Sequence, residues 1–234
     1  MDVTQATSAS GQNGFRRPLT AQEAVLRELR RAIMAGELRP GEHVLQEEVA
    51  DRLGVSRVPV REALKVLTAE GQVSYEAHRG YRVTELSVEE LRELYLMRRL
   101  LETEALRWAV PRVDAQDIKR LWALNEALEA VCANGDFLGV MELDREFHLA
   151  LFEKARLPRL LKTIRLLWQN SEPYRGVFLN ALDSRRRARR EHRAILKACE
   201  DGDVDSVIVA LDLHRENAIA DLAAVLDGEI ATNR

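Results

Sequence analysis

The chain has 234 residues, of which 46% are hydrophobic and 31% charged; such a composition buries sizeable cores and excludes an intrinsically disordered chain. Its net charge of -3 means that any contact with nucleic acid must come from a local basic patch. No stretch approaches the roughly 18 uncharged apolar residues of a membrane span. The first residues lack the apolar core of a signal peptide, and the two cysteines form no CxxC pair. We therefore expect a cytoplasmic protein of one large or two small domains.

The first part of the chain is expected to form a polar tail followed by a helix. Residues 1–18 are rich in Ser, Thr, Gln, Asn and Gly, which predicts a disordered tail. Thr20 and Glu23 have the spacing of a capping box, so a helix should begin there and end at Gly36. A turn over residues 38–41 and a short strand over residues 43–45 should follow.

Residues 46–67 have the pattern of a helix-turn-helix. A helix from Gln46 to Leu53 should end at the Gly54 turn, and Ser56 should cap the next helix with its hydroxyl. Pro59 falls in the first turn of that second helix, where its missing N–H costs nothing. The second helix should bury one apolar stripe, which consists of Val60, Ala63, Leu64 and Leu67. Its exposed edge should be cationic and consists of Arg57, Arg61 and Lys65. Such a helix can enter a DNA major groove, although an ordinary helical hairpin with a solvated basic face shows the same pattern.

A predicted β-hairpin completes an N-terminal winged helix-turn-helix domain over residues 19–85. Residues 73–75 and 81–83 alternate like two strands, joined by a turn over residues 77–80. Arg79 and Gly80 stand at the tip of this wing, where a cation beside a slim backbone can approach DNA. Basic and acidic residues are equal in number between Thr20 and Thr84, so DNA binding depends on how the charges are segregated.

Residues 86–228 contain only helical signals and predict an all-α bundle of six helices. The expected helix starts are marked by caps at Ser87, Asp114 and Asp136 and by Pro158. The fourth helix should run to about residue 170, and an irregular or helical stretch should begin at Pro173. The last two helices are expected over residues 183–199 and 204–226, and residues 229–234 form a C-terminal tail. The fold class is thus mainly α.

The bundle contains a possible metal ligand set. Asp144 and His148 are four residues apart and share a helix face, while His192 and His214 lie on the last two predicted helices. One carboxylate and three imidazoles suit a divalent transition metal ion such as zinc or nickel. The residues also allow a plainer interpretation, in which the histidines are core residues satisfied by hydrogen bonds and the Asp–His pair is a surface ion pair.

The segment LRRAIMAGELRPGEHVLQEEVADRLGVSRVPVREALKVLTAEG resembles the DNA-binding domain of the GntR family of bacterial transcription regulators. The helical remainder resembles the FCD effector domain of the FadR-like subfamily, in its smaller VanR-type form. Two residues depart from the usual pattern: Val58 replaces a common threonine, and Gln72 replaces an apolar residue, so packing at the base of the wing should differ.

The resemblance assigns roles to particular residues. DNA contacts are expected at the residues of the second helix and the wing tip, namely Ser56, Arg57, Pro59, Arg61, Lys65, Arg79 and Gly80. The D-x3-H, H and H pattern of the family assigns Asp144, His148, His192 and His214 to a metal. Arg98 matches a family position and either projects toward the effector cavity or pairs with Glu102.

The function that these features favour is a ligand-responsive, homodimeric transcription regulator, of repressor type, that binds a palindromic DNA operator. Its expected effector is a small carboxylate in a metal-containing helical pocket. Two alternatives remain from the residues. The first is a metal-dependent hydrolytic enzyme, because an Asp/His centre can activate water. The second is an architectural DNA-binding protein whose helical domain only dimerises. An enzyme would have no need of the LGVSRVPVREAL segment and its wing.

Overall fold

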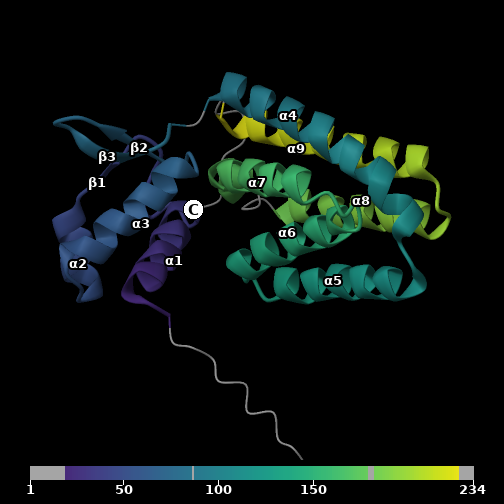
Figure 1. Cartoon of the computed structure of the whole chain (residues 1–234), viewed down its shortest axis with the longest axis horizontal. Helices are drawn as coiled ribbons and strands as arrows, with labels where there is room; N and C mark the ends of the chain where they lie inside the picture. The colour runs from purple at the N-terminus through teal and green to yellow at the C-terminus, as the bar shows by residue number, and fades with distance from the viewer. Residues whose placement is uncertain (1–18, 86, 179–181, 227–234) are drawn as a thin grey trace, which may run out of the picture.

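The computed structural model describes residues 19–85, 87–178 and 182–226, which form two bodies side by side (Figure 1). The predicted N-terminal and C-terminal tails, residues 1–18 and 229–234, lie outside the described residues. The first body holds a three-stranded sheet and three helices, and the second is entirely helical. The fold is therefore mainly α, as predicted. No described helix is long and apolar enough to span a lipid bilayer.

The first body is a winged helix-turn-helix. Its elements are α1 (Ala21–Met34), β1 (His43–Val44), α2 (Gln46–Leu53), α3 (Arg57–Ala69), β2 (Val73–Glu76) and β3 (Gly80–Val83). The strands are antiparallel in the order β1-β3-β2, with Tyr75 opposite Tyr81. The capping box at Thr20 forms, and Gly54 adopts a φ of 64° in the turn between α2 and α3. That left-handed conformation is cheap only for glycine, which explains the abrupt end of α2.

Two local predictions in this body are wrong. Ser56 occupies the N-cap position of α3 with extended backbone, but its side chain makes no capping hydrogen bond. The hydroxyl is therefore left free for another partner. Leu45 is not part of β1; it is the N-cap residue of α2 and its side chain is 52% exposed, because the sheet pairing of β1 ends at Val44.

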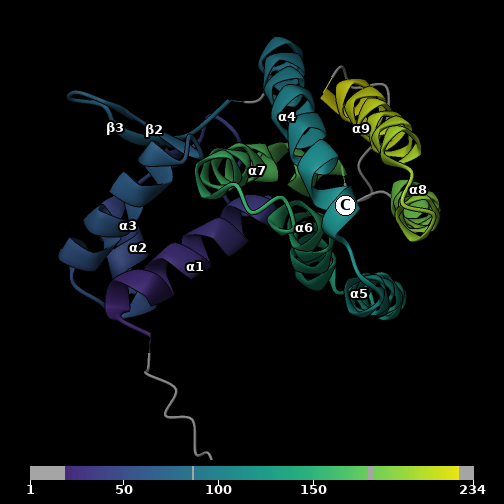
Figure 2. The ribbon, with the colours of Figure 1, turned by 45° about the vertical axis from the view of Figure 1, so that its right-hand side comes forward.

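The second body is a bundle of the six predicted helices. They are α4 (Val88–Ala109), α5 (Ala115–Ala133), α6 (Phe137–Glu153), α7 (Pro158–Phe178), α8 (Leu182–Glu200) and α9 (Val204–Leu226), with a 3-10 turn at Val110–Arg112. Ser87, Asp114 and Asp136 cap α4, α5 and α6 as predicted. Aromatic residues fill the core, including Phe147, Phe152 and Trp168. In both views α4 lies beside α9, and α1 of the first body reaches α7 (Figures 1 and 2).

The predicted end of the fourth helix near residue 170 is wrong. Helix α7 continues through Pro173 to Phe178. A proline inside a helix removes one hydrogen bond and normally kinks or breaks the helix. Here the carbonyl of Gln169, four residues before Pro173, receives a donor from outside the helix, the side-chain amide of Gln72. Tertiary contact therefore overrides the local stop signal, and the extension adds two turns that carry Glu172 and Arg175 into the bundle.

Candidate DNA interface and metal centre

Helix α3 separates its apolar and basic residues as the sequence predicts. Val60 and Leu64 are fully buried, whereas the side chains of Arg61 and Lys65 are 53% and 57% exposed. Residues four apart share a helix face, so these two cations and Arg57 form one exposed edge. This edge lies on the part of the winged helix that a DNA major groove would meet.

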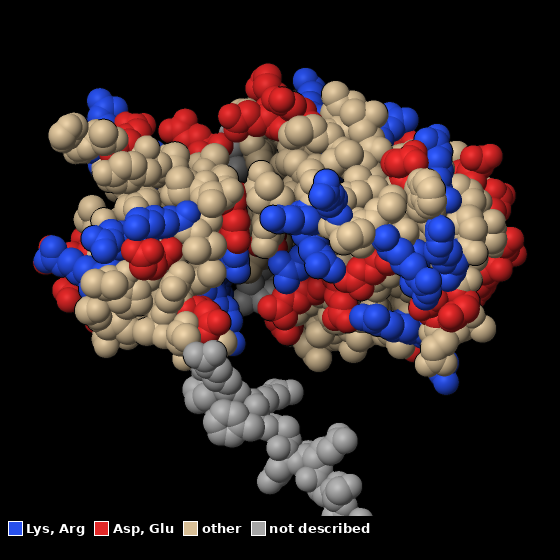
Figure 3. Space-filling model, in the orientation of Figure 1, with Lys and Arg blue, Asp and Glu red and all other residues tan. Residues whose placement is uncertain are grey.

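The basic edge is not free of negative charge. Each of its cations, and the cation at the wing, has a carboxylate partner: Arg57 pairs with Glu47, Arg61 with Glu62 at 3.5 Å, Lys65 with Glu62 at 3.0 Å, and Arg79 with Glu76 at 3.2 Å. Basic and acidic side chains accordingly alternate over this body in Figure 3. Exposed pairs of this kind are weak, so DNA phosphates can replace the carboxylates as partners.

A groove of about 510 Å³ lies between α3 and the wing. Arg61 and Lys65 line it together with Tyr75, whose side chain is 57% exposed. Tyr75 is a candidate contact that the sequence reasoning missed, because strand alternation shows that a residue points outward but not what it faces. Gly80 opens β3 at the wing turn with a φ of 86°, and Arg79 precedes it there.

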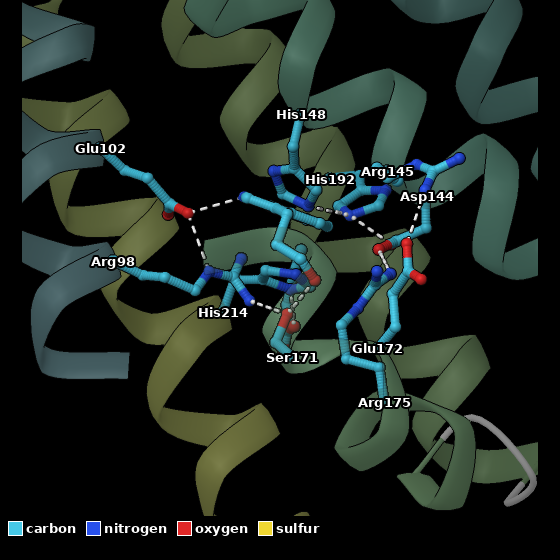
Figure 4. A network of polar contacts seen from close by, with 12 residues as sticks. Arg98, Glu102, Asp144, Arg145, His148, Ser171, Glu172, Arg175, His192 and His214 are labelled. Carbon is cyan, nitrogen blue, oxygen red and sulfur yellow. Dashed lines mark hydrogen bonds and ion pairs between the residues drawn. The ribbon is translucent and has the colours of Figure 1, made fainter. Parts of the chain in front are cut away.

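The four predicted metal ligands converge inside the bundle (Figure 4). Asp144 and His148 come from α6, His192 from α8 and His214 from α9, and one ligand atom of each lies within 4.8 Å of all the others. Asp144, His148 and His192 are buried, and His214 is half-buried. The alternative of a surface Asp–His ion pair is therefore wrong, because both side chains are in the core.

The distances within this cluster fit a first-row metal ion. The Nε2 atoms of His148 and His192 are 3.1 Å apart, and Nε2 of His192 is 3.3 Å from Oδ1 of Asp144. A metal–nitrogen distance of about 2.0–2.1 Å places neighbouring ligand atoms about 3.0–3.4 Å apart. Three imidazoles and one carboxylate are also the donor set that zinc and nickel accept. The residues present therefore fit the predicted group.

Neighbouring residues hold the histidines ready for coordination. The carboxylate of Glu191 lies 2.7 Å from Nδ1 of His214. Because an ionised carboxylate can only accept, Nδ1 donates, and in the neutral imidazole this contact leaves the Nε2 lone pair for a metal. Phe147 stacks on the ring of His192 at a centroid distance of 4.2 Å. Glu191 is a further residue that the sequence did not reveal, although its position directly before His192 placed it nearby.

Electrostatics favour the metal-binding protonation states of His148, His192 and Asp144. Burial, followed by the charges of His192 and His214, lowers the pKa of His148 well below its usual value. Burial likewise lowers the pKa of His192 to about 3. Burial opposes ionisation of Asp144, but Arg175 and His192 outweigh it and hold the pKa of this carboxyl below its ordinary value. Neutral imidazoles beside an ionised carboxylate are the metal-binding forms of these groups.

A small cavity of about 20 Å³ adjoins the cluster. It has room for a single water-sized molecule, so a carboxylate metabolite can enter only if side chains rearrange. Three arginines from different helices line the cavity with Asp144 and His214; they are Arg98 of α4, Arg175 of α7 and Arg215 of α9. An anion entering here would meet both the metal ligands and guanidinium groups.

The predicted pair of Arg98 with Glu102 is confirmed, and the role of Arg98 toward an effector stays a prediction. Arg98 lines the cavity, and its Nε donates to Glu102 at 2.9 Å, while Arg215 donates to the other oxygen of Glu102 at 2.7 Å. Arg98 and Arg175 lie on the ring of Trp168 at 4.0 and 4.6 Å.

Arg175 donates to Asp144, but its Nη1 is buried without a hydrogen-bond partner among the described residues. Arg175 was missed because the sequence placed it beyond the predicted end of its helix, so its face could not be assigned.

Comparisons with known proteins agree with this two-part architecture. The profile described as "Bacterial regulatory proteins, gntR family" matches residues 21–83, and the profile of the FCD domain matches residues 93–217. The first match covers the winged helix, and the second covers all four predicted metal ligands and Arg98.

Individual relatives are regulators of transcription. The chain is 31% identical over 194 residues to the Nta operon transcriptional regulator of Aminobacter aminovorans, covering 82% of this chain and 90% of that protein. It is also 31% identical over 146 residues to the regulator McbR of Escherichia coli, covering 62% of this chain and 66% of that protein.

Solved structures show the same fold over most of the chain. The structure of E. coli McbR/YncC aligns with a TM-score of 0.77 at 26% identity, covering 89% of this chain and 100% of that one. A GntR regulator from Rhodococcus sp. RHA1 aligns with a TM-score of 0.72 at 26% identity, covering 86% and 96% of the two chains.

Proposed function

Because the chain belongs to the GntR family of bacterial regulatory proteins and carries an FCD domain, we propose that it is a homodimeric repressor that senses a small carboxylate in a metal-containing pocket. Like its relatives, it is a DNA-binding regulator of transcription and not an enzyme. One observation carries the proposal: Asp144, His148, His192 and His214 converge in the core of a bundle that is joined to a winged helix. A regulator of the bacterial chromosome acts in the cytoplasm, where we place it.

The winged helix would read DNA through α3 and the wing. We propose that Arg61 and Lys65 enter the major groove with the first turn of α3, and that Arg79 and Gly80 approach the backbone or minor groove. The Ser56 hydroxyl, which makes no capping bond, is available to a phosphate. Ser56, Arg57 and Pro59 would position the start of the helix on the DNA.

In the bundle, a bound zinc or nickel ion would supply open coordination positions for a carboxylate. The chain's own residues hold that ion and the effector. His214 is fixed by Glu191, the neutral histidines offer lone pairs, and Arg175 supplies a buried N–H without a partner among the described residues. Arg98 and Arg175 would pair with the effector's carboxylate groups, since guanidinium recognises carboxylate bidentately. Entry requires the cavity to expand as these arginines rearrange.

The outer face of the bundle offers a surface for a second copy of the chain. Helices α4 and α9 pack side by side, and both expose large apolar residues, which are Leu96, Leu100 and Trp108 on α4 and Val209 and Leu213 on α9. Exposed apolar residues gathered on adjoining helices are typical of protein interfaces. A two-fold dimer through this face would present two winged helices to a palindrome, one to each half-site.

The DNA arm of this proposal is tested by mutation of α3. DNA duplexes are first selected from a random pool by the wild-type protein, and the affinity of Arg61→Ala is then measured on the selected duplex. Loss of one base-reading arginine should weaken specific binding by about 1–3 kcal/mol, or roughly 5- to 150-fold. Arg159→Ala, an exposed arginine at the start of α7, is the matched control. Equal affinity of the wild-type protein and Arg61→Ala would refute this role.

The sensing arm is tested by thermal melting and DNA binding with Zn²⁺ and a panel of small carboxylates. We expect Zn²⁺ with one acid to raise the melting temperature of the wild-type protein and to change its DNA affinity. His148→Ala should lose both effects, whereas His43→Ala, which changes an exposed residue outside the bundle, should keep them. A wild-type protein whose DNA affinity ignores every acid would instead favour the architectural alternative, in which the bundle only dimerises.

A further inference from the structure

Gln72 forms a buried polar contact between the two bodies. It follows the glycine that ends α3, and its side chain is fully buried. Its Nε2 lies 3.4 Å from the carbonyl of Gln169 and 3.3 Å from Oε2 of Glu172, both on α7. The side-chain amide of Gln72 therefore forms hydrogen bonds across the boundary between the winged helix and the bundle.

The partner of Gln72 on α7 is created by a proline. Pro173 carries no N–H, so the carbonyl of Gln169 loses its helical donor. Gln72 supplies the substitute from 97 residues away in sequence. A buried amide of one body therefore satisfies a carbonyl that the proline of the other body leaves without a donor.

Glu172 connects this contact to the candidate metal centre (Figure 4). Its other oxygen accepts from Arg145 at 2.5 Å, and Arg145 directly follows Asp144 on α6. One turn further along α7, Arg175 donates to Asp144 itself. Two parallel ion pairs thus link α6 to α7, one through a metal ligand and one through the partner of Gln72. A shift of α7 caused at Asp144 and Arg175 must therefore move Glu172 and the Gln169 carbonyl.

The contact is suited to breaking and reforming. Oε1 of Gln72 is buried without a hydrogen-bond partner among the described residues, and an unsatisfied buried polar atom costs about 1–3 kcal/mol. A cleft of about 390 Å³ adjoins the contact, lined by Arg27 and Met34 of α1 and by Met141 of α6. The interface between the two bodies is therefore incompletely packed. The observed placement of the winged helix also carries the free-energy cost of the unsatisfied oxygen, which the binding of a ligand can offset.

We propose that Gln72 is the positioning residue through which occupancy of the Asp144–His214 centre sets the placement of the winged helix. This inference rests on the proposed sensing function. When an ion and an anion engage Asp144 and Arg175, α7 shifts with Glu172 and the Gln169 carbonyl, and the Gln72 amide transmits the shift to the end of α3. By linkage, DNA binding and metal binding then change each other's affinity by the same factor.

The test compares the Zn²⁺ dependence of DNA affinity in the wild-type protein, Gln72→Leu and Gln116→Leu, each first freed of metal with a chelator. Leucine keeps the approximate volume of Gln72. It removes the unsatisfied oxygen but leaves the Gln169 carbonyl without its donor, and each of these changes is worth about 1–3 kcal/mol in opposite directions, so the variant should fold with a stability near that of the wild type, which thermal melting checks. Gln116, exposed on α5, is the matched control. The duplex is one selected by the wild-type protein, and Zn²⁺ affinity is measured separately without DNA.

Coupling of this kind typically changes an affinity about 5- to 150-fold. We expect Zn²⁺ to change the DNA affinity of the wild type and of Gln116→Leu by a factor in that range. In Gln72→Leu the shift should fall below about twofold, while Zn²⁺ affinity without DNA stays near the wild-type value. If Gln72 had only a structural role, Gln72→Leu would not lose the Zn²⁺ dependence of DNA affinity and at the same time keep its affinity for Zn²⁺.

Pro173→Ala provides an independent variant, because it restores the helical donor to Gln169 and competes with Gln72 for the same carbonyl. Its Zn²⁺-dependent shift should be smaller than that of the wild type, with the centre still able to bind Zn²⁺. An undiminished shift in both Gln72→Leu and Pro173→Ala would overturn the inference and leave the sensing function standing. A wild-type DNA affinity that does not respond to Zn²⁺ or to any carboxylate would overturn both.

Discussion

Replacing Glu102 with glutamine should strongly destabilise the bundle. Glu102 is fully buried and accepts hydrogen bonds from Arg98 at 2.9 Å, from the indole of Trp168 at 2.7 Å and from Arg215 at 2.7 Å. Glu102→Gln keeps the shape of the side chain, but it removes the one negative charge shared by two buried guanidinium groups and turns an amide donor toward other donors. Breaking a buried pair from one side costs about 3–5 kcal/mol.

For a chain of this size, that loss corresponds to a fall in melting temperature of about 6–20 °C, measured by calorimetry or circular dichroism. Glu104→Gln, two residues along the same helix, removes an exposed carboxylate that pairs with Arg107 and should leave the melting temperature close to that of the wild type. If the two variants melted at the same temperature, the reasoning from buried charge would be refuted.

The same group predicts a pH dependence of stability. Burial opposes ionisation of Glu102, but Arg98 and Arg215 outweigh it and hold its pKa below the ordinary value of 4.5. The unfolded chain therefore takes up this proton at a higher pH than the folded chain does. The stabilisation by Glu102 is fully present above pH 4.5 and is lost as the pH falls through that value toward the folded-state pKa. Glu102→Gln should lack this component of the acid-side loss.

Three further predictions concern other parts of the molecule. Glu62→Gln removes the carboxylate shared by Arg61 and Lys65, so DNA affinity should rise. The slope of log affinity against log salt should steepen by about 0.9 for each additional phosphate that the protein neutralises. An unchanged slope would mean that these cations do not face DNA. Leu213→Asp places a charge on the proposed dimer face and should yield monomers in sedimentation, while a dimer that persists would place the interface elsewhere. Burial raises the pKa of the Cys199 thiol to about 12, so at pH 8 this cysteine should react with a thiol reagent only after unfolding. The partly exposed Cys132 is first replaced by alanine, and rapid reaction of that folded variant would contradict the burial of Cys199.

Much of the fold is encoded in short-range signals that the sequence displays. Thr20, Ser87, Asp114 and Asp136 cap helices as their spacing predicts, because a cap is a contact between residues three apart. The buried stripe of α3 likewise follows from helical periodicity alone. Ser56 shows the limit of such reasoning: the residue type fixes the cap position, but the side chain makes no capping bond.

The features that the sequence did not reveal depend on distant residues. The continuation of α7 past Pro173 rests on a donor from Gln72 in the other body, so no window around the proline could have predicted it. Arg175 was unassignable for the same reason, because its place in the site depends on that continuation. The size of the cavity is set by how Arg98, Arg175 and Arg215 pair with buried carboxylates, and this pairing follows from tertiary packing.

The candidate metal centre was predictable in part from local sequence and depends in part on contacts between distant residues. The spacing of Asp144 and His148 places both on one helix face, which local sequence shows. The arrival of His192 and His214 from two other helices is a matter of packing, and it was the resemblance to the FCD family that joined all four into one set. The structure brings their ligand atoms together, and their role as metal ligands stays a prediction.

The most direct test of this account is the metal content of the purified protein, measured by elemental analysis after extensive dialysis beside His148→Ala and His43→Ala. We predict about one transition metal ion per chain in the wild type and in His43→Ala, and a nearly metal-free His148→Ala, because four converging protein ligands bind a divalent ion tightly and the loss of one weakens that binding. A wild-type protein that is metal-free and fails to retain added zinc or nickel would contradict the account, and so would full retention of metal by His148→Ala.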